Sequence, residues 1–124
     1  MNMTTTTPQI ITDLDLNQIQ TYIQFDKLLL SNIDKVLNLL GPECKQKIYQ
    51  HLHNNYNIEK EEIPRRIEEF SDALETIFGT STRILEINIM KMLHQSTPET
   101  EYVEINPDLT FSEYVKKLRR KIVH

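Results

Sequence analysis

The chain has 124 residues, 26% of them charged, with a formal net charge of -4 at pH 7 and a single cysteine, Cys44. This length fits one domain with a sizeable core, and a lone cysteine excludes an intramolecular disulfide. Because the N-terminus lacks the basic and apolar stretches of a signal peptide, and no apolar run reaches about 18 residues, we expect a cytoplasmic protein with no membrane partner.

Charge is distributed unevenly along the chain. Residues 1–110 contain 9 basic and 17 acidic residues, net -8, whereas residues 111–124 contain 5 basic residues and 1 acidic residue, net +4. An acidic body argues against nucleic-acid binding by residues 1–110. The last segment is therefore the only cationic candidate.

Residues 1–14 predict a disordered arm, because four threonines and Pro8 leave too few apolar residues to offset the entropy of ordering. From Asp15 onward, apolar residues recur at spacings of three and four, which is typical of a helix. The pattern leaves open whether this is one long helix or two helices joined near residues 24–26. The apolar positions are Ile19, Tyr22, Ile23, Phe25, Leu28, Leu29, Ile33, Val36, Leu37 and Leu40.

The two glycines of the chain, Gly41 and Gly79, each follow two bulky apolar residues and are predicted to end helices in a left-handed conformation. Pro42 suits the first turn of a new helix, which we expect over about residues 42–54. A further helix is predicted over about residues 67–78, with a buried face of Ile67, Phe70, Leu74, Ile77 and Phe78.

Between these two helices lies a charged connector, under which Ile58 and Ile63 are expected to be buried. The most apolar stretch follows, from Gly79 to His94, where seven of the ten residues from Ile84 to Leu93 are apolar. A helix that is apolar on nearly all sides must be surrounded by other helices. We therefore expect it at the centre of the fold, with Thr80 or Ser81 as its N-cap.

Residues 95–109 are polar and flanked by prolines, and are interpreted as a linker or strap. The last helix, residues 110–124, is predicted to begin near Thr110 or Ser112 and to be amphipathic. Its apolar face is Tyr114, Val115, Leu118 and Ile122. Its basic face is Lys116, Lys117, Arg119, Arg120 and Lys121, which we expect to contact an acidic surface of this chain, of a second copy or of a partner.

No group of residues predicts catalysis, a metal ion or a cofactor. His51 and His53 are two positions apart, which directs them to opposite sides of a helix, whereas a helical zinc pair needs a spacing of three or four. Cys44 shares the apolar face of its helix, where a thiol is usually inert. The carboxylates lie in charged runs typical of a solvated face, so the sequence predicts neither an enzyme nor a small-molecule substrate.

Together these patterns predict an all-α fold: a single small bundle of about five helices around a central apolar helix, with residues 15–94 as its main domain. Residues 26–94 resemble an archaeal family, the Nitrosopumilus output domain. The resemblance rests on VLNLLG, IYQHLHNNYNI, EEIPRRIEEFSDALETIFG and TSTRILEINIMKML. It implies a small helical module at the output end of archaeal signalling proteins, and it implies no catalytic residues.

The expected function is accordingly a non-catalytic, protein-interaction or output module. Two alternatives remain open. One is a small nucleic-acid-binding protein that uses the basic C-terminal helix, and the other is a structural subunit that associates with itself. Self-association would use the first long helix, where Leu28, Leu29, Leu30 and Ile33 cover more than one face.

Overall fold

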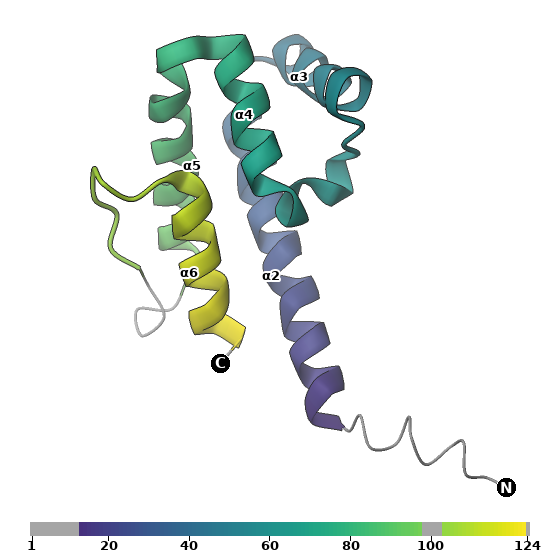
Figure 1. The fold of residues 1–124 in the computed structure, drawn as a ribbon, viewed down its shortest axis with the longest axis vertical. Coiled ribbons are helices and arrows are strands. Elements are labelled where there is room, and N and C mark those ends of the chain that lie inside the picture. The colour runs from purple at the N-terminus through teal and green to yellow at the C-terminus, as the bar shows by residue number, and fades with distance from the viewer. Residues whose placement is uncertain (1–12, 98–102, 124) are drawn as a thin grey trace, which may run out of the picture.

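The computed structural model describes residues 13–97 and 103–123, which form a bundle of α-helices (Figure 1). No strand occurs in these two stretches, so the all-α prediction is confirmed, as is the expected number of about five helices. None of the described helices is both long and apolar enough to cross a membrane. The elements are α2 (Asp13–Asn38), α3 (Pro42–Tyr56), η1 (Lys60–Arg65), α4 (Ile67–Phe78), η2 (Gly79–Ser81), α5 (Thr82–Gln95) and α6 (Phe111–Val123), where η marks a 3₁₀ helix.

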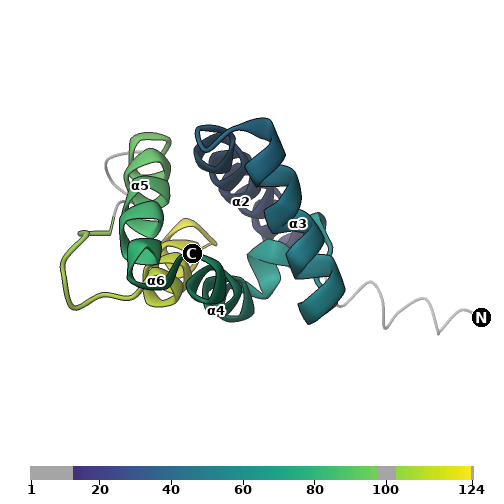
Figure 2. The same ribbon diagram turned by 90° about the horizontal axis from the view of Figure 1, so that it is seen from above.

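Helix α2 is one continuous helix of 26 residues, which decides the question left open by the sequence. Helix α2 begins at Asp13, so the last two residues of the predicted disordered arm, 13 and 14, are helical. The rest of that arm lies outside the described residues. The C-terminal half of α2 packs against α3, α5, α6 and η1, as the view along the bundle shows (Figure 2). That half buries Phe25, Leu29, Ile33, Val36 and Leu37.

The apolar helix predicted at the centre, α5, lies in the core but is not enclosed. Ile89, Met90 and Leu93 are fully buried, whereas Ile84 is 67% exposed. Ile84 shares its side of the helix with exposed Asn88, and a single apolar residue on a surface is common. A high density of apolar residues therefore indicated burial correctly but not on every side, and α2 and α4 each contact at least as many other elements as α5 does.

Both glycines have the predicted positive φ, but only Gly79 directly follows its helix, since α2 ends at Asn38, three residues before Gly41. Gly41 has a φ of 100° and Gly79 a φ of 60°, and Asn57 ends α3 in the left-handed region with a φ of 53°. The connector coils into η1 and buries Ile58 and Ile63 as expected. The expected burial of Ile77 is wrong, since Ile77 is 38% exposed in the last turn of α4, while Phe78 is partly buried against the core.

The strap and the last helix belong to the body. Val103 and Leu109 are buried, which pins the described part of the strap, while residues 98–102 lie outside the described residues. At the start of α6, the Thr110 hydroxyl accepts the Glu113 N–H (3.1 Å) and the Glu113 carboxylate accepts the Thr110 N–H (3.0 Å), a capping box. Helix α6 then buries Phe111, Tyr114, Val115 and Leu118.

Candidate functional site

The basic face of α6 is partly used inside the molecule. Lys116 Nζ lies 2.5 Å from Glu68 Oε1 on α4. Arg119 Nη2 donates to Asp26 Oδ1 on α2 (2.7 Å) and to the Pro64 carbonyl oxygen (2.9 Å). Its guanidinium also lies over the Phe25 ring, 5.1 Å from the ring centre. The structure therefore brings these two predicted residues onto acidic groups of their own chain.

The other three predicted residues, Lys117, Arg120 and Lys121, are on the exposed side of α6. Lys117 and Arg120 are accessible to an acidic surface from outside. Within the basic face, Arg119 is the residue held mainly by its own chain, because Lys116 keeps 53% of its side chain exposed and Arg119 only 21%.

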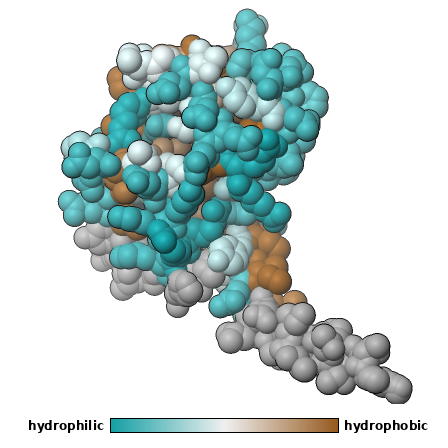
Figure 3. All heavy atoms as spheres, in the orientation of Figure 1, coloured by the Kyte–Doolittle hydropathy of each residue, from teal (hydrophilic) through white to brown (hydrophobic). Residues whose placement is uncertain are grey.

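A different surface, whose apolar residues the sequence identified only by their helical spacing, lies on the N-terminal half of α2. Residues 16–24, LNQIQTYIQ, contain no charged residue, and none of them is buried. Leu16 is 60% exposed, Ile19 52%, Tyr22 42% and Ile23 41%. This half of α2 extends beyond the other helices (Figure 1), and hydrophobic side chains gather over it (Figure 3). We call residues 16–24 the uncharged face of α2.

The uncharged face continues into a groove where α2 meets the body. The groove has a volume of about 430 Å³ and is lined by Ile19, Tyr22, Ile23, Asp26, Arg65 and Arg119. Its floor is apolar. At one end of the groove, Asp26 is paired with Arg119, and its carboxylate also lies 3.6 Å from Arg65 Nε.

The residues that the sequence offered for self-association are used elsewhere. Leu29 and Ile33 are fully buried, and Leu28 and Leu30 are half-buried against the core. Leu29 and Ile33 are therefore not available for self-association, whereas Leu28 and Leu30 are only partly covered. The lack of charge does not by itself identify the exposed surface, because residues 48–58 also lack Asp, Glu, Lys and Arg and contain the buried Ile48, Leu52 and Ile58.

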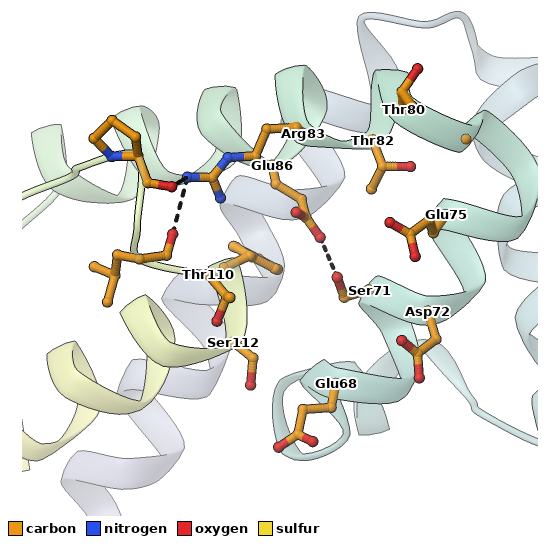
Figure 4. Close-up of a pocket in the computed structure, with 14 residues that line it drawn as sticks. Glu68, Ser71, Asp72, Glu75, Thr80, Thr82, Arg83, Glu86, Thr110 and Ser112 are labelled. Atoms are coloured by element: carbon orange, nitrogen blue, oxygen red, sulfur yellow. Dashed lines mark hydrogen bonds between the residues drawn. The ribbon is translucent and has the colours of Figure 1, made fainter.

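A second concave site lies between α4, α5 and the start of α6 (Figure 4). It is an open cleft of about 460 Å³. Arg83 stands in its wall, and its Nη2 donates to the carbonyl oxygens of Asn106 (3.3 Å) and Leu109 (3.0 Å), which ties the strap to α5. Four carboxylates line the cleft: Glu68, Asp72, Glu75 and Glu86.

Glu86 is the buried member of this acidic set, with 6% of its surface exposed. The Ser71 hydroxyl donates to Glu86 Oε2. Burial raises the pKa of Glu86, and nearby Glu75 adds to this, while Ser71 and Arg83 oppose it. An acidic cleft of this kind favours cations, and Ser112 Oγ, which is buried in its wall, has no hydrogen-bond partner among the described residues.

Another polar cluster joins α2, α3 and η1 around Asp34. Its carboxylate accepts hydrogen bonds from Tyr49 Oη (2.8 Å) and Lys45 Nζ (3.3 Å), and Lys60 Nζ lies 3.4 Å away. Burial opposes ionisation of Asp34, but these three groups outweigh it and lower the pKa of Asp34. Burial and Asp34 together raise the pKa of Tyr49. The cluster is satisfied internally and holds three elements together.

The histidines and the cysteine considered for metal binding have other surroundings. His53 Nδ1 lies 2.5 Å from Glu59 Oε2, whereas His51 Nδ1 lies 2.8 Å from Asn55 Nδ2. Cys44 is half-buried against the core, near its predicted place. Across residues 13–97 and 103–123, no three histidine, cysteine or acidic side chains are grouped as a metal ion would require.

The fold and these surfaces define a small all-α bundle with an uncharged, projecting helix face. The chain matches no protein-family model, no curated protein and no solved structure. The resemblance to the Nitrosopumilus output domain therefore stays a prediction.

Proposed function

We propose that this protein is a non-catalytic interaction module that binds another polypeptide through the uncharged face of α2. The observation that carries the proposal is nine consecutive helical residues that are unburied and uncharged, with four large apolar or aromatic side chains among them. The cores of protein interfaces are depleted of charge and enriched in aromatic and apolar side chains. An ordinary solvated helix face would carry charged residues instead.

The local energetics support the same proposal. Isolated helices shorter than about 12 to 15 residues are marginal in water, because most helical stability comes from packing of an apolar face. The N-terminal half of α2 receives little such packing from its own chain. A bound partner would supply it.

Following the resemblance over residues 26–94, we further propose that the module acts in the cytoplasm as an output element of archaeal signal transduction. In this proposal the bundle is a rigid support and α2 is the contact element. The partner would be a protein, since a neutral apolar face offers nothing that selects a nucleic acid.

The nucleic-acid alternative has less support. It depends on the basic face of α6. Two residues of that face, Lys116 and Arg119, form ion pairs with Glu68 and Asp26 of the same chain. Nucleic-acid binding through the exposed cations Lys117, Arg120 and Lys121 would have an affinity that falls steeply as salt rises. Binding of that kind would be lost on replacing these three residues and kept on changing α2.

A catalytic alternative would use the acidic cleft, where Ser71 donates to Glu86 as a nucleophile would to a base. Such chemistry also needs a donor aimed at the developing charge. The cation in the wall, Arg83, directs Nη2 at strap carbonyl oxygens instead. The cleft therefore supports catalysis less well than α2 supports binding.

The proposal is tested by photo-crosslinking in lysate of the source cells. A photoreactive amino acid replaces Gln20 on the uncharged face or, as the matched control, Lys91 on the exposed side of α5. We expect protein adducts from position 20 but not from position 91, and we expect Ile19→Lys to remove them. Equal labelling from both positions, or adducts that survive Ile19→Lys, would overturn the proposal.

A further inference from the structure

The uncharged face of α2 has no charge with which to select a partner of opposite sign. Its polar residues are Asn17, Gln18, Gln20, Thr21 and Gln24. Amide side chains carry both donors and acceptors, so the same set of residues on a second copy can satisfy them. A surface of this composition can meet itself without like-charge repulsion.

The apolar stripe has a second property that suits self-pairing. Leu16, Ile19 and Ile23 are spaced by three and then four residues, so they share one side of the helix and span about 10 Å at 1.5 Å per residue. Reversing the helix exchanges Leu16 with Ile23 and leaves Ile19 near the middle. An isologous interface requires a patch of this kind, which matches itself after a two-fold rotation.

The shape of the molecule selects the antiparallel arrangement. The C-terminal half of α2 is surrounded by α3, α5, α6 and η1, whereas the N-terminal half extends beyond them (Figure 1). In a parallel pair the two bodies would meet at the same end of the helix pair. In an antiparallel pair the bodies lie at opposite ends, and the first turns of each α2 reach the groove beside Ile23 and Arg65 of the other copy.

We propose that the partner of the uncharged face is a second copy of this chain, bound with the two α2 helices antiparallel and a two-fold axis beside Ile19. This inference rests on the proposed function, because it identifies the occupant of the same surface. The groove at the base of each α2 is then filled by its partner, and Leu16 of each copy lies against Ile23 of the other.

The area available predicts a reversible dimer. Four side chains, each about half exposed, offer roughly 300 to 400 Å² of apolar surface per copy, which is the size of the largest patch on a typical monomer. With the flanking amides, the pair would bury on the order of 1,200 Å² in total, at the lower end for specific complexes. We therefore expect association in the micromolar range. Salt should have a modest effect, because residues 16–24 are uncharged and the charged residues of the groove, Asp26, Arg65 and Arg119, lie at the ends of the contact.

The test is sedimentation equilibrium of the purified full-length chain at several concentrations and two salt concentrations. We expect a concentration-dependent dimer at both salt concentrations. Ile19→Lys places two like charges beside the axis and should weaken the dimer at least about tenfold. The matched control is Ile84→Lys, the same change at an exposed isoleucine of α5, which should leave association unchanged.

A mixture of two oppositely charged variants shows whether position 19 of one copy lies beside position 19 of the other. A variant that only lost apolar surface would not be rescued by such mixing. Ile19→Lys and Ile19→Glu should each be monomeric with an unchanged helical circular dichroism spectrum, and a mixture of the two should form a heterodimer. A wild-type chain that stays monomeric at high concentration, or a mixture that does not associate, overturns the self-pairing. If the wild-type chain is monomeric but still crosslinks through position 20 to a different protein, only the self-pairing fails. If it neither dimerises nor crosslinks to another protein, the proposed function fails as well.

Discussion

Replacing Arg119 with alanine tests whether α6 is held on the body by one half-buried cation. The guanidinium donates to Asp26 and to the Pro64 carbonyl oxygen and lies over the Phe25 ring, and only 21% of its side chain is exposed. A hydrogen bond between charged groups contributes about 1.5 to 3 kcal/mol, a second bond to a carbonyl about 1 kcal/mol, and the aromatic contact about 0.5 to 1 kcal/mol.

Allowing for the residual exposure of both partners, we expect Arg119→Ala to lower the free energy of unfolding by about 3 kcal/mol, and the melting temperature by about 10 °C. The assay is urea unfolding followed by circular dichroism. Arg119→Lys should recover only part of the loss, because an ammonium cannot reproduce the planar fork. Lys117→Ala, on the exposed side of the same helix, should stay within about 0.5 kcal/mol of wild type.

A double-mutant cycle with Asp26→Asn isolates the ion pair, and we expect a coupling energy of about 1 kcal/mol or more. Asp26 also lies 3.6 Å from Arg65, so some of its interaction survives the loss of Arg119. If Arg119→Ala were as stable as Lys117→Ala, or the coupling energy were zero, α6 would not be held as described.

Three further predictions concern the core and two carboxyl groups. Ile89→Ala should cost about 2 to 5 kcal/mol because Ile89 is fully buried, while Ile84→Ala should stay within about 0.5 kcal/mol, and urea unfolding of both measures the contrast. Since the folded pKa of Glu86 is raised, its contribution to stability is present below its unfolded pKa and lost as pH rises through the folded value. Glu86→Gln should therefore raise the melting temperature at pH 7 and lose this advantage below about pH 4.5, and a melting temperature at pH 7 equal to or below wild type would contradict the assigned environment. The folded pKa of Asp34 is lowered, so its contribution is present above its unfolded pKa and lost as pH falls; Asp34→Asn should cost on the order of 1 kcal/mol at pH 7, and this difference should shrink at low pH in thermal unfolding.

The parts of the fold that depend on local chemistry could be predicted from the sequence. Gly79 directly follows α4, and Thr110 with Glu113 marks the start of α6, because capping residues act on their immediate neighbours. The depth of burial of Ile89 also followed from its apolar surroundings.

The surfaces could not be predicted in the same way. Ile19 and Ile33 obey the same helical spacing, yet one is 52% exposed and the other fully buried, because periodicity does not say whether a face is covered. Arg119 and Asp26 are 93 positions apart, so their contact depends on the tertiary arrangement. The burial of Glu86 could not be predicted either, because it depends on residues of α4 and of the strap that are close to it only in the folded chain.

The most direct test of the uncharged face is amide hydrogen exchange of the wild-type chain at low and high protein concentration. In a monomer, the projecting half of α2 has solvent-exposed backbone hydrogen bonds and should exchange fast. We predict that residues 16–24 exchange at least about tenfold more slowly at the concentration where the dimer forms, while residues 85–93 of the core do not change. Equal exchange rates for residues 16–24 at both concentrations would contradict the account.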